Sequence, residues 1–96
     1  MSLGFEWNDH KARTNFQKHG VDFVEAASVF SNPLARIFVD EGHSTGELRE
    51  IIIGHSSRKR LLLVFYTEPE KERIRIISAR SATRREQYDY EEAVTN

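Results

Sequence analysis

Residues 8–20 carry the hydrophobic and polar spacing of a short helix. Asn8 is suited to cap its amino-terminal end, and Phe16 lies one turn beyond Ala12. Gly20 follows the last periodic residue and can adopt the left-handed conformation that ends many helices. The pattern predicts a first helix that ends at residue 20.

A second helix is predicted over residues 22–32. Asp22 is a suitable N-cap, and Glu25 three residues later completes the sequence of a capping box. Pro33 marks the end of the periodic segment. Apolar side chains recur at positions i, i+3, i+4 and i+7, which places them on one helix face: Phe23, Ala26, Ala27 and Phe30.

The middle of the chain is rich in β-branched and aromatic residues, which favour strands. In the sequence "RIRI", the alternation predicts that Ile74 and Ile76 are buried, whereas Arg73 and Arg75 lie on the opposite face. The short links "SSRK" and "EPEK" are typical of hairpins and therefore predict antiparallel pairing. Four strands are expected, over residues 34–40, 49–56, 60–68 and 73–79.

The last periodic segment covers residues 83–93 and begins with "TRRE". Thr83 as N-cap and Glu86 at the third helical position form a second capping box, which predicts a carboxy-terminal helix. The predicted order of elements is ααββββα. This order indicates an α+β fold, in which two amino-terminal helices and one carboxy-terminal helix pack on a four-stranded antiparallel sheet.

Length and composition restrict the class of protein. A chain of 96 residues builds one hydrophobic core, so a single domain is expected over residues 1–96, with an ordered core of about residues 5–93. The first four residues, "MSLG", resemble a remnant of an expression vector. No apolar run approaches the roughly 18 residues that span a bilayer, and cysteine is absent. We therefore expect a cytoplasmic protein without disulfides, thiolate metal sites or membrane contact.

Basic residues are concentrated in one window of the chain. Residues 71–85 contain six basic side chains and one acid, which gives this window a net charge of +5 against −6 for the rest. Arg84 and Arg85 occupy the predicted first turn of the last helix, although the partial positive charge of a helix amino terminus favours acids. The pattern indicates either an anion-binding site or a solvated basic edge.

Four segments together resemble the BrnT family of toxins from type II toxin–antitoxin systems: "FEWNDHKARTNFQKHGVDFVEAASVFSNPLA", "HSTGELR", "RLLLVFYTE" and "RIRIISARSATRREQYDYEE". The resemblance extends from about Phe5 to Glu91. It implies a small bacterial ribonuclease with a RelE-like fold, whose RNA cleavage inhibits translation and growth. It also implies a ribbon-helix-helix antitoxin as partner, with DNA contacted only through that antitoxin. After Glu86, the sequence "QYDYEEA" is more acidic than the arginine-rich continuation typical of the family.

Metal-independent RNA cleavage requires a base for the 2′-hydroxyl proton, an acid for the departing 5′-oxygen, and cations for the phosphate. Arginine suits the last role, because its planar fork binds two phosphate oxygens and stays charged at neutral pH. His55 is expected at the rim of the sheet, and Tyr90 lies one turn after Glu86. The predicted catalytic residues are Arg80, Glu86, His55 and Tyr90. The predicted phosphate-binding residues are Arg75, Arg84 and Arg85. These three arginines converge with Arg80 if the last strand ends beside the helix.

Several other chemistries lack their motifs. The sequence contains no GxxxxGK[ST] phosphate loop, no HExxH and no serine in a nucleophile elbow. His43 and Glu47 have metal-ligand spacing only if they lie on a helix, whereas "HSTGE" is typical of a loop. We therefore expect neither a metal nor another cofactor. Two alternatives to a ribonuclease remain: a non-catalytic module whose basic face binds RNA or an acidic protein, and a stable oligomer whose arginines pair with neighbouring acids.

Overall fold

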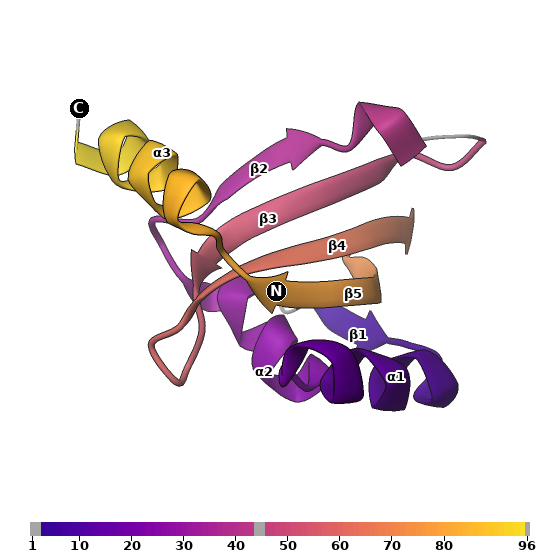
Figure 1. Cartoon of the computed structure of the whole chain (residues 1–96). Helices are drawn as coiled ribbons and strands as arrows, with labels where there is room; N and C mark the ends of the chain where they lie inside the picture. The colour runs from indigo at the N-terminus through magenta and orange to yellow at the C-terminus, as the bar shows by residue number, and fades with distance from the viewer. Residues whose placement is uncertain (1–2, 44–45, 96) are drawn as a thin grey trace.

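The computed structural model describes residues 3–43 and 46–95 of the chain. Within these ranges the sheet contains five strands in the order β1-β5-β4-β3-β2: β1 (Gly4–Glu6), β2 (Arg36–Val39), β3 (Arg49–His55), β4 (Leu61–Glu70) and β5 (Arg73–Ser81). The same residues form three α-helices (Figure 1), α1 (Asp9–His19), α2 (Phe23–Ser28) and α3 (Arg84–Thr95), and two 3-10 turns, η1 (Val29–Ser31) and η2 (Glu41–His43). No helix in the described ranges has both the length and the apolar character needed to cross a membrane.

The sheet differs from the prediction in one respect. The pattern predicts four antiparallel strands, whereas the described residues form a mixed sheet of five, because β1 pairs in parallel with β5. β1 spans three residues, too few to show the alternation of a strand. It is held by distant contacts, since the Gly4 N–H donates to the Glu72 carbonyl at 2.8 Å and the Phe5 ring packs on Phe30. Of the opening "MSLG", residues 1–2 lie outside the described ranges. The RelE-like character stays a prediction.

One face of the sheet is covered by α1 and α2 (Figure 1). Ile74 and Ile76 are 4% and 1% exposed, which confirms the predicted alternation, and Arg73 and Arg75 are exposed. The apolar face predicted for the second helix is also confirmed, because its residues pack into the main core. This core contains Val21, Phe23, Ala26, Val29, Ile52, Leu62, Val64, Tyr66 and Ala79 as well.

A polar residue docks α1 onto the sheet. Asn15 is 5% exposed, whereas Phe16 is 53% exposed. The Asn15 carboxamide accepts a hydrogen bond from the Ala79 N–H at 3.0 Å and donates to the Ala79 carbonyl at 2.9 Å and to the Val21 carbonyl at 3.0 Å. The two bonds to Ala79 satisfy backbone groups on β5 beyond the end of β1. α1 therefore stands where a further strand would pair with β5.

One buried carboxylate joins α2 to two distant segments. The Asp22 carboxylate accepts the Glu25 N–H at 2.7 Å, so half of the predicted capping box is formed. The Glu25 side chain, however, accepts hydrogen bonds from Ser56 Oγ at 2.6 Å and from Arg60 Nε at 2.9 Å, and a further one from Arg60 Nη2. Arg60 also donates to the Gly20 carbonyl at 3.0 Å. Glu25 thus connects the β3–β4 hairpin with the end of α1.

Candidate functional site

The face of the sheet opposite α1 and α2 is only partly covered, because α3 lies across one end of it (Figure 1). The strand register places Phe38 opposite Ile51 and Ile51 opposite Phe65, so these side chains form one row across three strands. Phe38 is 47% exposed, and Phe65 is partly exposed. Arg80 on β5 lies opposite Leu63 on β4, in the row of side chains next to the row that contains Phe65. We call the surface formed by Phe38, Ile51, Phe65 and Arg80 the open face.

The predicted capping box at the start of α3 is confirmed. The Glu86 N–H donates to Thr83 Oγ1 at 3.1 Å, and the Thr83 N–H donates to Glu86 Oε1 at 2.9 Å. Both bonds satisfy backbone donors that a helix start otherwise leaves unpaired. The Glu86 side chain is consequently directed back toward the end of β5.

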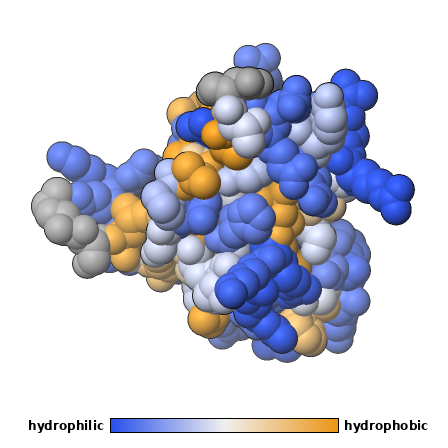
Figure 2. All heavy atoms as spheres, turned by 90° about the vertical axis from the view of Figure 1, so that its left-hand side faces the viewer, coloured by the Kyte–Doolittle hydropathy of each residue, from blue (hydrophilic) through white to orange (hydrophobic). Residues whose placement is uncertain are grey.

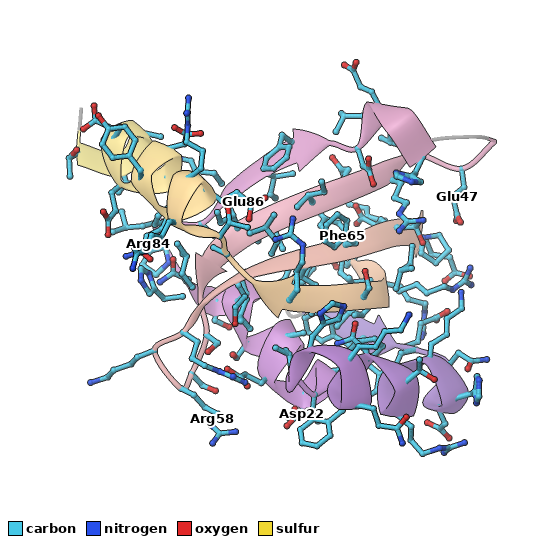
Figure 3. The ribbon with its side chains drawn as sticks, in the orientation of Figure 1. Asp22, Glu47, Arg58, Phe65, Arg84 and Glu86 are labelled. Carbon is cyan, nitrogen blue, oxygen red and sulfur yellow. The ribbon has the colours of Figure 1, made fainter. Side chains whose placement is uncertain are left out.

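Arg80 and Glu86 form a bidentate ion pair at the edge of the open face. Arg80 Nη1 donates to Glu86 Oε1 at 2.8 Å, and Nη2 donates to Oε2 at 2.9 Å. The guanidinium carbon lies 5.8 Å from the centre of the Phe65 ring, and Figure 3 shows Phe65 and Glu86 on this side of the sheet. Hydrogen bonding to Arg80 lowers the pKa of Glu86 to about 2, and Glu86 raises the pKa of Arg80. Glu86 therefore orients a permanent cation beside an aromatic ring.

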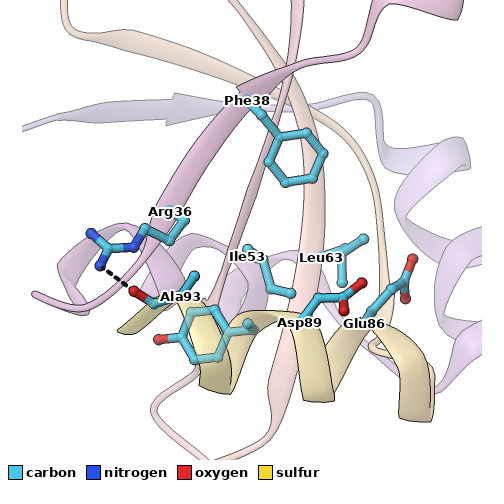
Figure 4. Close-up of a pocket in the computed structure, with 8 residues that line it drawn as sticks. Arg36, Phe38, Ile53, Leu63, Glu86, Asp89 and Ala93 are labelled. Carbon is cyan, nitrogen blue, oxygen red and sulfur yellow. Dashed lines mark hydrogen bonds between the residues drawn. The ribbon is translucent and has the colours of Figure 1, made fainter. Parts of the chain in front are cut away.

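A hollow of about 260 Å³ lies between α3 and the open face (Figure 4). Its walls are mostly apolar, and Arg36 on one side donates from Nη2 to the Ala93 carbonyl at 3.2 Å. The carboxylates of Glu86 and Asp89 also line it, and they repel phosphate. The hollow therefore suits an apolar or aromatic group. Its lining residues are Arg36, Phe38, Ile53, Leu63, Glu86, Asp89, Tyr90 and Ala93.

The expected convergence of four arginines is wrong for Arg75. Arg75 precedes Arg80 by five residues on β5, and a strand rises about 3.3 Å per residue, so their backbone positions are roughly 17 Å apart. Arg75 Nε donates to Glu6 Oε2 at 2.8 Å, which ties Arg75 to β1. A phosphate bound at Arg80 is therefore out of reach of Arg75.

Arg84 and Arg85 lie in the first turn of α3, as predicted. Arg85 is 85% exposed and pairs with Asp89 at 3.2 Å. Arg84 is exposed, and within the described ranges no acid forms an ion pair with it. Figure 3 shows that Arg84 and Glu86 extend from α3 in different directions, and Figure 2 shows a mainly hydrophilic surface at this end of the molecule. Both guanidinium groups are therefore exposed at the end of the helix that carries Glu86.

His55 and Tyr90 lie beside each other, and Tyr90 follows Glu86 by one turn of α3. Their ring centres are 5.8 Å apart, and the rings meet edge to face. Tyr90 is 4% exposed, its hydroxyl donates to the Leu34 carbonyl at 2.9 Å, and burial raises its pKa. His55 is exposed and borders a separate hollow with Ser28, Ser31, Asn32, Pro33, Ser56 and Ser57.

The segment considered for metal binding is only partly described. His43 lies in η2, and its Nδ1 is 3.2 Å from Asp40 Oδ1. Residues 44–45, in the middle of the expected loop, lie outside the described ranges. Among the residues that are described, no three His, Asp or Glu side chains gather in a group that could hold a metal ion.

Sequence reasoning missed the aromatic residues of the open face. Phe38 and Phe65 belong to apolar segments, and only the strand register shows that they share a row on the uncovered side. The segment "RIFVD" contained a usable signal, because Phe38 stands between Arg36 and Asp40 on one face of the strand. An aromatic residue flanked in this way indicates a solvent-facing surface.

Thr83→Ala is expected to lower the free energy of unfolding by about 1 kcal/mol, because the Glu86 N–H loses its acceptor. Urea unfolding followed by circular dichroism measures the change. Thr95→Ala removes a hydroxyl that donates to the Glu91 carbonyl at the other end of α3, and this control should change stability by less than about 0.5 kcal/mol. Equal unfolding midpoints for Thr83→Ala and the parent would show that the cap contributes nothing.

The chain matches, over residues 7–86, the family described as "Ribonuclease toxin, BrnT, of type II toxin-antitoxin system". Among solved structures, it is similar to the crystal structure of the Brucella abortus ribonuclease toxin BrnT. The two share 26% sequence identity with a TM-score of 0.66, and the match covers 86% of this chain and 100% of the Brucella chain. No curated protein matches the sequence.

Proposed function

Because the chain belongs to the BrnT family of ribonuclease toxins of type II toxin–antitoxin systems, we propose that it is an endoribonuclease that cleaves RNA without a metal ion and thereby inhibits translation and growth. The proposal rests on the position of Arg80, because Glu86 holds this side chain at the edge of the open face beside Phe65. A fixed cation next to an exposed aromatic ring suits a nucleotide, whose phosphate and base need these two contacts.

In this proposal Arg80 binds the phosphate whose ester bond breaks. An arginine side chain has five N–H donors. Among the described residues, Arg80 uses two of them on Glu86 and one on the Ser81 carbonyl, so two remain for phosphate oxygens. Arg84 and Arg85 bind flanking phosphates, and Arg75 binds one farther along the strand. A base adjacent to the cleaved bond stacks on Phe65 or enters the hollow beneath α3.

Proton transfer falls to His55, which is exposed at the end of β3. This role requires the 2′-hydroxyl beside the phosphate at Arg80 to lie within hydrogen-bond reach of the His55 ring. Tyr90 acts by supporting the His55 ring, because its own hydroxyl is committed to the Leu34 carbonyl. Glu86 is a positioning residue, because a carboxylate with a pKa of about 2 is a weak base at neutral pH.

Glu86→Gln separates positioning from proton transfer. The variant keeps an oxygen for the Thr83 N–H but loses the charge that orients Arg80, so we expect about tenfold slower cleavage, weaker RNA binding and near-normal stability. The parent should show no titration of Glu86 between pH 5 and pH 8, since its pKa is about 2. A loss of roughly 100-fold with unchanged RNA binding would instead assign Glu86 as the general base.

The activity itself is tested by incubating purified protein with single-stranded RNA in a buffer that contains a chelator. Cleavage products with 2′,3′-cyclic phosphate ends are expected, because the 2′-hydroxyl is the proposed nucleophile. RNA binding without any cleavage would favour the non-catalytic binding module. Cleavage that stops on chelation and returns with a divalent cation would overturn metal independence alone.

The antitoxin is proposed to be a ribbon-helix-helix protein that covers the open face and the arginines around it. Phe38 gives this face an aromatic ring at 47% exposure, whereas the neighbouring Ile37 and Val39 point to the opposite side of the sheet. Acidic and apolar groups of an inhibitor would therefore complement this surface. A purified toxin–antitoxin complex that cleaves RNA at the full rate of the free toxin would contradict this placement.

A further inference from the structure

A second groove lies along the edge of β5 that faces away from β4, between this strand and α1. It is lined by His10, Lys11, Thr14, Asn15, Lys18 and His19 from the helix and by Ile77 and Ser78 from the strand. Asn15 is buried and holds the helix on Ala79, so the lysines and histidines on either side of it are fixed relative to the sheet. All four of these basic side chains are exposed.

The charge of this groove is of one sign. α1 carries a single acid, Asp9 in its first turn, and the groove lining contains none. Within the described ranges, neither Lys11 nor Lys18 forms an ion pair with an acid, in contrast to Arg80 and Arg75. The hollow beneath α3 differs, because two carboxylates line it. The α1–β5 groove is therefore the better site for a polyanion.

The groove is continuous with the open face. Ser78 lines the groove and is paired with Phe65 in the strand register, so the row of Phe38, Ile51 and Phe65 leads directly to it. β1 pairs with β5 only up to Arg75, and beyond that point α1 lies along the edge of β5, with the groove between them reaching Ser78. A chain lying on the open face can thus cross β5 into the groove.

We propose that the α1–β5 groove binds the phosphates of the same RNA strand whose cleavage site lies at Arg80. The inference rests on the proposed ribonuclease function and adds the path of the substrate. Lys11 and Lys18 each neutralise a phosphate, and the histidines donate hydrogen bonds to phosphate oxygens. Stacking at Phe65 and phosphate binding in the groove then hold the nucleotides on one side of the cleaved bond.

The test compares charge removal on two sides of α1. Lys11→Gln and Lys18→Gln, singly and together, remove charges from the groove, and Arg13→Gln removes one from the opposite side, where Arg13 borders a different hollow with Phe16 and Gln17. Binding of a 2′-O-methylated single-stranded RNA, which lacks the reacting hydroxyl, is measured by fluorescence anisotropy over a range of salt concentrations. Cleavage of the unmodified RNA is measured in parallel, and melting curves check that the variants fold.

The double lysine variant should bind the RNA at least about tenfold more weakly than the parent does. The slope of the logarithm of the binding constant against the logarithm of the salt concentration should decrease in magnitude by about 1.4, or about 0.7 for each lost phosphate contact. Each single lysine variant should weaken binding more than Arg13→Gln does. If the parent cleaves RNA but all variants bind equally well, the groove inference is overturned and the ribonuclease function stands. If the parent neither binds nor cleaves RNA, both are overturned.

Discussion

Replacing Arg80 with alanine is expected to reduce RNA cleavage by roughly 100-fold or more, because the variant lacks the cation that we propose stabilises charge on the reacting phosphate. Toxicity toward a host culture should be lost together with cleavage. Stability should change little, since Arg80 and Glu86 are 33% and 31% exposed and an ion pair of this kind contributes no more than about 1 kcal/mol. Initial cleavage rates and urea unfolding of the same preparations measure both effects.

Arg73→Ala is the matched control for Arg80→Ala. Arg73 lies at the other end of β5, is 51% exposed and also pairs with a glutamate. It is far from Phe65 and α3, so cleavage should stay within about twofold of the parent. Parent-like cleavage by Arg80→Ala would refute the role of Arg80. If Arg80→Ala loses activity and also unfolds, Arg80→Lys separates the two effects. This variant keeps the positive charge, and we expect it to cleave RNA faster than Arg80→Ala but more slowly than the parent.

Local patterns predicted the elements that position the site. The capping sequence at Thr83, the stop at Gly20 and the alternation around Ile74 depend on residues only a few positions apart, and each is confirmed. Such patterns are reliable because caps and strand alternation follow from backbone geometry within one element. The start of α3 and the faces of β5 were therefore predictable from the sequence.

Contacts between distant elements were not predictable in the same way. The convergence expected of Arg75 with Arg80 fails because the two residues are five positions apart along β5. The row of Phe38 and Phe65 exists only through the register of β2, β3 and β4. The basic side of α1 was overlooked because the window of highest charge lies elsewhere in the chain. Its relation to the open face depends on Asn15, whose burial no hydrophobic pattern indicates.

The two capping sequences show where local reasoning ends. Asp22 with Glu25 and Thr83 with Glu86 have the same spacing, and both caps accept the expected backbone N–H. The Glu86 carboxylate accepts the Thr83 N–H, which completes the capping box, and it also binds Arg80, because β5 ends beside the first turn of α3. The Glu25 side chain instead points into the protein interior, where it binds Arg60 of the β3–β4 hairpin. The tertiary partner decides the role of each glutamate.

Glu25→Ala is expected to lower the free energy of unfolding by about 1.5–3 kcal/mol, because it removes charge-assisted hydrogen bonds from Arg60 and from the Ser56 hydroxyl. The side chain of Arg60 is 36% exposed and can be solvated by water in the variant, whereas the buried Ser56 hydroxyl loses its acceptor. The loss should also loosen the end of α1, since Arg60 binds the Gly20 carbonyl. Urea unfolding at neutral pH measures the change.

The pH dependence gives an independent check on the same ion pair. Hydrogen bonding to Arg60 lowers the pKa of Glu25 below its ordinary value of 4.5, so its stabilisation is fully present above that pH and is lost as the pH falls further. The stability difference between the parent and Glu25→Ala should therefore shrink as the pH decreases below 4.5. Glu6→Ala, which removes a partly exposed partner of Arg75, should lower stability much less than Glu25→Ala does. Similar losses for the Glu25 and Glu6 variants would show that burial adds nothing to the Glu25–Arg60 pair.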